Sequence, residues 1–203
     1  MVIVYDEELN WFTDVVVKWR HIHENFSRLW LDNKEGSFWH IERAQISVLA
    51  GAIWQMGGLV LEEFQSNKES ETHGEWKGRT DMIFVLDGTE RIVETKAYWP
   101  NLGANQNWDE DIDNSIDAAL RDTKATLNGN KKQKIKEGLA IVFIGPHFLP
   151  REDLTVLHEF HETLSSKKHN IDLLAWYTAE KALLSPAKHE YRRLYMAVKR
   201  IPL

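Results

Sequence analysis

The sequence predicts an α/β fold in which a central mixed β-sheet is flanked by helices. Segments with apolar residues at helical spacing alternate with short apolar runs of strand length. The dipeptide Asp87-Gly88 lies between two apolar segments and is a strong signal for a two-residue hairpin turn. The 203 residues are enough for one domain with a full hydrophobic core, and no stretch rich in Pro, Gly or Ser divides them.

The N-terminal part of the chain predicts two helices. Residues 7–30 carry apolar residues at spacings of three and four, which would form one wide apolar stripe on a helix. After a polar break, Ser37 can cap a second helix over residues 37–56. Gly57-Gly58 ends this helix, because glycine readily adopts the left-handed conformation common after a last helical turn.

The middle part predicts three strands. Residues 59–64 form the first strand, and the polar residues 65–77 form a loop. Residues 80–86 and 90–95 are apolar and partly β-branched, so we expect them to form the two strands that the Asp-Gly turn joins.

The remaining segments alternate between helix and strand. A helix over residues 114–127 precedes residues 139–144, a short apolar run typical of a buried strand. A helix over residues 151–168 and a strand over residues 171–177 follow, and residues 190–201 fit either a helix or a strand. The predicted order is therefore α-α-β-β-β-α-β-α-β.

We expect one domain over residues 1–203, with three parts. Residues 1–36 are an N-terminal helical extension, residues 37–177 are the core that holds the sheet, and residues 178–203 are a C-terminal extension.

The composition of the chain excludes some kinds of site and some classes of protein. The chain has no cysteine, which excludes disulfides and thiolate metal sites. It shows neither a signal peptide nor an apolar stretch near the ~20 residues that span a bilayer, so we expect a cytoplasmic protein with no membrane attachment. The net charge of −6 counts against a surface broadly coated with Lys and Arg for nucleic acid, but it is compatible with a local basic groove.

Asp81, Glu94 and Lys96 are the candidate catalytic residues. A two-residue turn would place Asp81 directly opposite Glu94, and side-chain alternation would put Lys96 on the same face. Residues directly opposite each other have Cβ atoms about 5 Å apart, so two carboxylates there repel, and a cation between them would relieve this repulsion. A longer turn would instead move Asp81 opposite Lys96.

Two carboxylates and a lysine suit the metal-assisted hydrolysis of a phosphodiester. Hard oxygen ligands favour Mg²⁺ or Mn²⁺ over zinc. A bound divalent cation lowers the pKa of its water and neutralises charge that develops on a phosphate. A neighbouring lysine can orient the water or stabilise the transition state.

Asp81, followed after a gap of twelve residues by Glu94-Thr95-Lys96, resembles the signature of the PD-(D/E)xK nucleases, the restriction-endonuclease-like superfamily. The proline of that signature is a threonine here, at a position that varies in the family. The resemblance implies a restriction-endonuclease-like core of helix, hairpin, strand, helix and strand, which residues 37–177 match in predicted order. It also implies that Asp81 and Glu94 bind Mg²⁺, that Lys96 assists the attacking water, and that the products carry a 5′-phosphate.

Glu42 is a further candidate metal ligand. It lies in line with the apolar stripe of the second predicted helix, and a carboxylate on such a stripe needs a partner. Many members of the PD-(D/E)xK family carry a Glu on the helix before the hairpin, pointing at the metal. The alternative role for Glu42 is an interaction with the helix dipole, and Glu62 and Glu63 are a second option as ligands.

Candidate nucleic-acid-binding residues come from a basic cluster and from one tryptophan. Lys131, Lys132 and Lys134 could contact phosphates or form a solvated turn. Trp99, just past the predicted catalytic strand, could stack on a base or pack in the core. A second basic patch near the C-terminus has the same two interpretations; it consists of Arg192, Arg193, Lys199 and Arg200.

We therefore expect a Mg²⁺-dependent nuclease, with Mn²⁺ as a substitute, that hydrolyses phosphodiester bonds of DNA as an endo- or exonuclease. The alternative is a non-catalytic nucleic-acid-binding or regulatory subunit that keeps the nuclease fold. A homodimer and a larger nuclease complex are both open as assemblies.

Overall fold

The computed structural model describes residues 1–29, 42–103, 107–131, 133–149, 154–166, 169–185 and 188–203. The helices in this part of the chain are the 3₁₀ helix η1 (Glu7–Leu9) and the α-helices α1 (Phe12–Leu29), α2 (Glu42–Gln55), α3 (Trp108–Gly129) and α4 (Thr155–Ser165). The strands are β1 (Val2–Val4), β2 (Leu59–Ser70), β3 (Gly74–Leu86), β4 (Thr89–Tyr98), β5 (Glu137–Ile144), β6 (His147–Phe148), β7 (Leu173–Leu184) and β8 (Glu190–Pro202).

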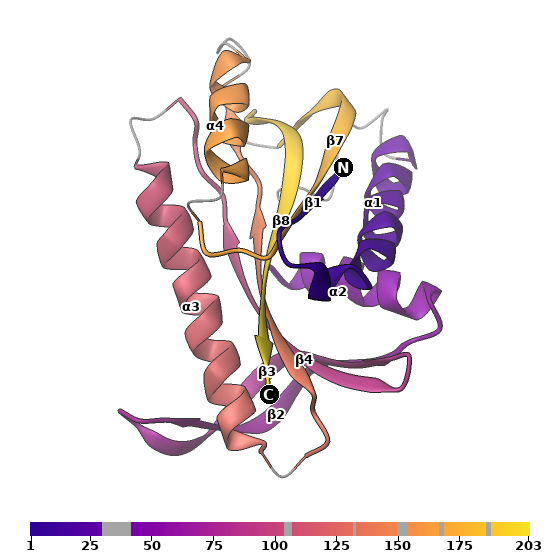
Figure 1. The fold of residues 1–203 in the computed structure, drawn as a ribbon. Helices are drawn as coiled ribbons and strands as arrows, with labels where there is room; N and C mark the ends of the chain where they lie inside the picture. Colours follow the sequence, from indigo (N-terminus) through magenta and orange to yellow (C-terminus); the bar gives the residue numbers. More distant parts are fainter. Residues whose placement is uncertain (30–41, 104–106, 132, 150–153, 167–168, 186–187) are drawn as a thin grey trace.

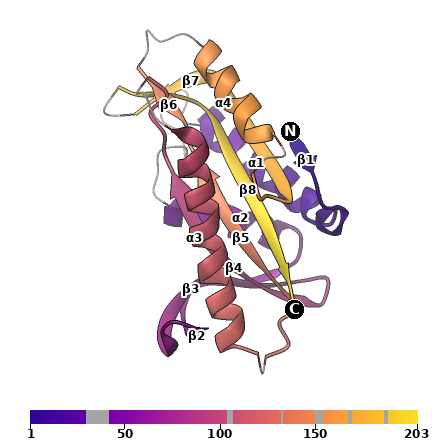
Figure 2. The ribbon, with the colours of Figure 1, turned by 60° about the vertical axis from the view of Figure 1, so that its left-hand side comes forward.

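These strands form one open, mixed sheet of eight strands, which confirms the predicted α/β class (Figure 1). The strand order is β1-β7-β8-β5-β4-β3-β2, and β6 pairs with β8 beside this path. The pairing between β4 and β5 is parallel, and the other pairings between these named strands are antiparallel. Helices cover both faces, with α3 and α4 on one side and α1 and α2 on the other (Figure 2).

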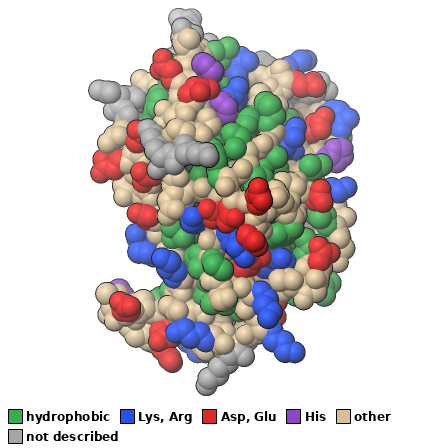
Figure 3. All heavy atoms as spheres, in the orientation of Figure 1, with side chains coloured by type: hydrophobic (Ala, Val, Ile, Leu, Met, Phe, Trp, Pro, Cys, Tyr) green, Lys and Arg blue, Asp and Glu red, His purple; other side chains and the backbone are tan. Residues whose placement is uncertain are grey.

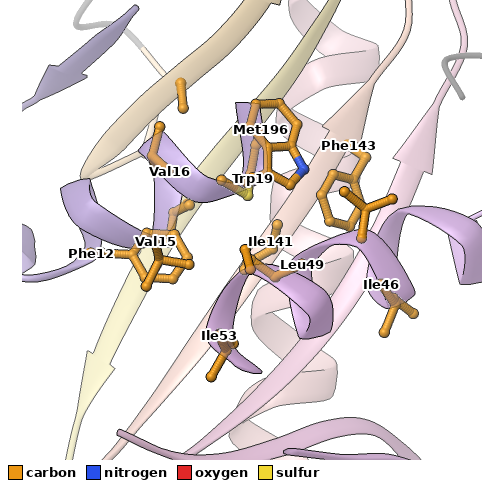
Figure 4. Packing of buried hydrophobic residues seen from close by; sticks show 14 of the residues in the cluster. Phe12, Val15, Val16, Trp19, Ile46, Leu49, Ile53, Ile141, Phe143 and Met196 are labelled. Carbon is orange, nitrogen blue, oxygen red and sulfur yellow. The ribbon is translucent and has the colours of Figure 1, made fainter. Parts of the chain in front are cut away.

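The hydrophobic core is divided by the sheet into two main clusters. The first core cluster packs α1 and α2 onto one face, and Figure 4 shows Trp19 and Leu49 against Ile141 of β5. The second core cluster packs α3 and α4 onto the other face, where they contact Ala140 and Val142 of β5. Successive residues of β5 thus point to opposite clusters, which explains why this strand is apolar without alternation.

The hairpin of β3 and β4 has the predicted register. Asp87 and Gly88 have φ angles of 51° and 71°, the positive values that a type I′ turn requires at both central positions. Leu86 pairs with Thr89, and the pairing continues without a slip as far as Met82 and Val93. The local turn therefore sets the position of Asp81 relative to β4.

Residues 65–77 were predicted to be a loop, and this prediction was wrong. The pairing of β2 with β3 runs through this segment to Ser70 and Gly74, and its polar residues form a hairpin that curls under the end of α3 (Figure 1). Polar contacts replace apolar packing here. One of them joins the Ser66 and Thr80 hydroxyls, which lie 2.6 Å apart. In addition, Asn130 Nδ2 donates to the backbone oxygen of residue 67 at 2.8 Å.

Three further segments refine the predicted elements. The helix predicted over residues 7–30 is divided into η1, whose start is capped by the Asp6 side chain, and α1. The segment 190–201, which fitted a helix or a strand, is strand β8, and it lies between β5 and β7 inside the sheet. The predicted start of the second helix at Ser37 lies outside the described residues, and its end at Gly57 has the expected positive φ of 81°.

In the described part of the chain, none of the helices has both the length and the apolar character needed to cross a lipid bilayer.

The contact between Gly129 and the polar hairpin yields a test of the fold. A Cβ atom at this position would lie 2.3 Å from the backbone oxygen of Asn67. We expect Gly129→Ala to lower the free energy of unfolding by about 1–3 kcal/mol, because two backbones would have to separate. Urea denaturation measures this change.

Gly51→Ala is the matched control. Gly51 lies inside α2, and an added Cβ would meet only Ile22 Cδ1 at 3.5 Å, an ordinary contact. This substitution should raise the free energy of unfolding by about 0.5–1 kcal/mol through helix propensity. Equal effects of the two substitutions would contradict the close approach of α3 and the hairpin.

Candidate functional site

The regular ladder of the sheet is interrupted beside Asp81. Glu62 pairs with Met82 and Phe64 pairs with Thr80, but the residues between them are not paired. Glu63 has a positive φ of 54°, which is unfavourable for a residue with a side chain. In an unbroken sheet, successive side chains would point to opposite faces. At this break in β2 and β3, polar side chains can lie together.

The break changes which face of the sheet β2 side chains point to. Alternation along an unbroken strand would put Val60 and Lys68 on the same face. Val60 packs against the first core cluster, whereas Lys68 reaches Glu94 and α3 on the opposite face. Glu63, with its left-handed conformation, lies between the two residues.

Glu42 and Asp81 meet at the side chain of Thr95. The Thr95 backbone N–H donates to Asp81 Oδ2 at 2.7 Å, and the Thr95 hydroxyl lies 3.0 Å from the same oxygen. The hydroxyl also lies 2.5 Å from Glu42 Oε1. A hydroxyl has one proton to donate, so it cannot serve both carboxylates at once. The first residue of α2 is thereby brought to the β3–β4 hairpin.

The pKa of Glu42 is raised by its environment. Burial is the main cause, and the negative charges of Asp81 and Glu63 raise the pKa further. The hydrogen bond from Thr95 and the charge of Lys96 act in the opposite direction without cancelling the rise. The pKa of Glu42 thus responds to burial first and to the two neighbouring carboxylates second.

These carboxylates line a pocket of about 240 Å³ between α2, β2 and β3. The lining residues are Glu42, Arg43, Ile46, Glu63, Arg79 and Asp81. Glu63 thus belongs to the pocket, while Glu62 does not line it and accepts a hydrogen bond from the Ser47 hydroxyl at 2.9 Å.

Glu94 is buried on the α3 side of β4, with an exposed fraction of 2%. The Thr126 hydroxyl donates to its Oε1 at 2.5 Å, and Lys68 Nζ lies 3.0 Å from the same oxygen. Burial raises the pKa of Glu94 to about 7, and the charge of Asp81 contributes to the rise, while Thr126 and Lys68 oppose it. Both contacts engage Oε1, so in the described part of the chain Oε2 has no hydrogen-bond partner.

Lys96 is held by α3 and not by Glu94. Its Nζ donates to Asp122 Oδ2 at 2.6 Å and to the backbone oxygen of Thr95 at 3.0 Å. Burial lowers the pKa of Lys96, but the hydrogen bond and charge of Asp122 outweigh it, so the pKa is raised overall. Lys96 is therefore a protonated cation with a fixed position.

The four predicted site residues are close enough to influence one another's charge. Asp81 raises the pKa of both Glu42 and Glu94, and Glu42 and Asp81 both raise the pKa of Lys96. Their hydrogen bonds nevertheless diverge, toward Thr95 on one side and α3 on the other. Within the described residues, no three acidic or histidine side chains converge into a ready-made metal site.

The predicted nucleic-acid-binding residues make their contacts elsewhere than with the four site residues. Lys131 Nζ is 3.8 Å from Glu69 on the polar hairpin, and Lys134 is exposed. Lys132 lies outside the described residues. Trp99 is half-buried and packs against the first core cluster, which favours the packing interpretation.

The C-terminal basic patch is engaged inside the protein. Lys199 Nζ donates to Asp172 at 2.6 Å, and the Arg200 guanidinium donates to Glu137. Arg192 pairs with Glu190 on the same strand. More broadly, acidic and basic side chains are interspersed on the described surface seen in Figure 3, in keeping with the absence of a broad basic coat.

The sequence reasoning missed several residues around the site. Lys68 was placed in a loop, because its neighbours are polar and give no apolar pattern. Asp122 and Thr126 are four residues apart on α3, so their shared helix face was a usable signal for a polar strip facing β4. Arg79 stands two residues before Asp81 and could not be placed without the break in the strands.

Comparisons with known proteins do not assign a family. No family model matches the chain, and no curated protein matches it. Among solved structures, one described as the crystal structure of SSO0001 is 13% identical and covers 77% of this chain and 78% of its own, with a TM-score of 0.25.

The raised pKa of Glu94 predicts a pH-dependent stability in the presence of EDTA. The folded state holds the proton up to about pH 7, whereas the unfolded chain loses it near 4.5. The stabilisation is thus complete below pH 4.5 and is lost as the pH rises through 7, by about 3 kcal/mol in total. Urea denaturation between pH 4.5 and 8 should show the decline, and Glu94→Gln should flatten it. A variant profile parallel to that of the wild type would refute the buried carboxylate.

The two lysines should differ in their effect on stability. The Lys68–Glu94 pair has side-chain exposures of 10% and 3%, while the Lys96–Asp122 pair has 33% and 44%. At pH 8, Lys68→Met should cost about 3 kcal/mol, because it leaves a buried charge without its partner. Lys96→Met should cost less than about 1 kcal/mol. Both values come from urea denaturation, and equal losses would show that the Lys68 contact is not a buried one.

Proposed function

We propose that this protein is a metal-dependent nuclease that hydrolyses phosphodiester bonds, with DNA as its substrate. The observation that carries the proposal is the meeting of Glu42 and Asp81, which both line one pocket, at Thr95, the residue between Glu94 and Lys96 in the sequence. These are the residues that the resemblance to the PD-(D/E)xK nucleases assigns to the site.

The arrangement of elements supports the same proposal. Helix α2 is followed by the β2–β3 hairpin, β4, α3 and β5, and β4 pairs with β5 in parallel. This is the order of helix, hairpin, strand, helix and strand that the resemblance implies for a restriction-endonuclease-like core. We include β2 in this core as the strand that brings Glu63 to the pocket.

The crowding of carboxylates supports a divalent cation as the missing partner. Glu42 and Asp81 share one hydroxyl donor, and the pKa of Glu42 is raised in part by Asp81. Oxygen donors of this kind fit Mg²⁺ or Mn²⁺. Glu42 and Asp81 would hold the cation. The resemblance also assigns Glu94 to the metal; it lies on the α3 side of β4, and its side chain would have to turn toward Asp81 to become a third ligand. Such a cation would activate water and offset charge that develops on the phosphate.

The protein side chains would contribute position and charge to this reaction. Lys68 and Thr126 fix the carboxylate of Glu94, and Asp122 fixes the ammonium group of Lys96. A protonated Lys96 beside the carboxylates can stabilise negative charge on the attacked phosphate or orient the attacking water through a hydrogen bond. Thr95, between the two, holds Asp81 and Glu42 in one place.

One observation favours a non-catalytic nucleic-acid-binding or regulatory protein as the second candidate. Each lysine at the site already neutralises a carboxylate, Lys68 that of Glu94 and Lys96 that of Asp122. A protein that never binds a metal would need such internal pairing to keep Glu94 buried.

A cleavage assay separates the two candidates. Circular and linear DNA, single-stranded and duplex, are incubated with the protein and Mg²⁺, Mn²⁺ or EDTA. We expect cleavage with either metal and none with EDTA. Asp81→Asn, Glu94→Gln and Lys96→Met should each lower the rate by about 100-fold or more, since each removes a group that acts on the transition state.

Glu71→Gln, on the exposed turn between β2 and β3, is the matched control and should cleave like the wild type. Cleavage at the wild-type rate by the three site variants would refute the mechanism. If DNA binds without cleavage under every metal condition, the non-catalytic candidate is the correct one.

A further inference from the structure

Two arginines stand at the pocket beside the candidate catalytic carboxylates. Arg43 follows Glu42 on α2, and Arg79 lies two residues before Asp81 on β3. Both guanidinium groups pair with Glu63, at 3.3 Å for Arg43 and 2.6 Å for Arg79. One carboxylate thus holds two arginines, which come from different elements, on the same pocket.

These arginines differ from the other cations of the site. Lys68 and Lys96 are each matched to one carboxylate and are mostly buried or half-buried. Arg43 and Arg79 share a single carboxylate and have side-chain exposures of 60% and 56%. Exposed ion pairs of this kind add little to stability, so the fold does not explain why two guanidinium groups gather here.

The charge of the pocket changes sign when a divalent cation binds. Its three carboxylates, Glu42, Glu63 and Asp81, and its two arginines together carry one net negative charge when all are ionised. A divalent cation would leave one net positive charge. A phosphodiester carries one negative charge, so the loaded pocket would match it.

We propose that Arg43 and Arg79 form a phosphate-binding pair that holds the DNA backbone at the pocket, with Glu63 keeping the two guanidinium groups side by side. This inference rests on the nuclease proposal, because it takes a phosphodiester as the ligand. Arginine suits the role, since its planar group offers paired N–H donors that match two phosphate oxygens. The pair would be specific for the backbone and indifferent to base sequence.

Binding measured without cleavage tests the pair. Fluorescein-labelled oligonucleotides, single-stranded and duplex, are titrated with the full chain in Ca²⁺, and anisotropy gives Kd at several salt concentrations. Arg43→Ala and Arg79→Ala should each weaken binding by about 10-fold for every sequence and reduce the salt dependence of log Kd by about one. Arg43→Lys and Arg79→Lys keep the charge but lose the paired donors, and should fall between alanine and wild type.

Arg28→Ala, at an exposed position of α1, is the matched control and should bind like the wild type. Wild-type affinity in the Arg43 and Arg79 variants would overturn the inference, as would a wild-type protein that binds no DNA. The cleavage assay reports separately on the nuclease proposal. If the wild type cleaves while the arginine variants bind normally, only the phosphate pair is wrong; if the variants bind weakly and nothing cleaves, only the nuclease proposal is wrong.

Discussion

The buried carboxylate of Glu94 constrains the elements around it. A charge with an exposed fraction of 2% needs partners, and here they come from β2 through Lys68 and from α3 through Thr126. To supply Lys68, β2 must extend through a polar segment and reverse its face at Glu63. Gly78 leaves room for the aliphatic part of the Lys68 side chain. Gly129 allows the end of α3 to approach the hairpin backbone closely. The contacts of one buried carboxyl group thus connect β4 with β2 and α3.

Thr95 connects this buried side of β4 to the open pocket. It lies between Glu94 and Lys96 in sequence, and alternation points it to the opposite face, toward α2. Through its backbone N–H and its hydroxyl it contacts Asp81 and Glu42. The middle residue of the Glu-Thr-Lys segment therefore links the two carboxylates that its neighbours do not contact.

Local signals in the sequence predicted much of the fold and the residues of the candidate site. The two residues of the Asp87-Gly88 turn determine the register of the β3–β4 hairpin. The apolar run of β5 indicates a strand that is buried on both faces. The contacts of the site could not be predicted in the same way. Simple alternation places Asp81 and Glu94 on one face, but Asp81, beside the break at Glu63, accepts its hydrogen bonds from Thr95. The strand position of Lys68 could not be predicted, because a hairpin stabilised by polar contacts lacks the alternation of apolar residues that indicates a strand.

The position of β8 has a consequence for how the sheet assembles. β5 and β7 do not pair with each other, and both pair with β8, which follows them in the sequence. During synthesis, the half-sheet of β2 to β5 and the segment of β7 with β1 therefore emerge from the ribosome before the strand that joins them. Until β8 inserts, each presents an unpaired inner edge, and such edges attract other strands. The nascent chain thus has a period in which it depends on rapid insertion of β8, or on chaperones, to avoid aggregation.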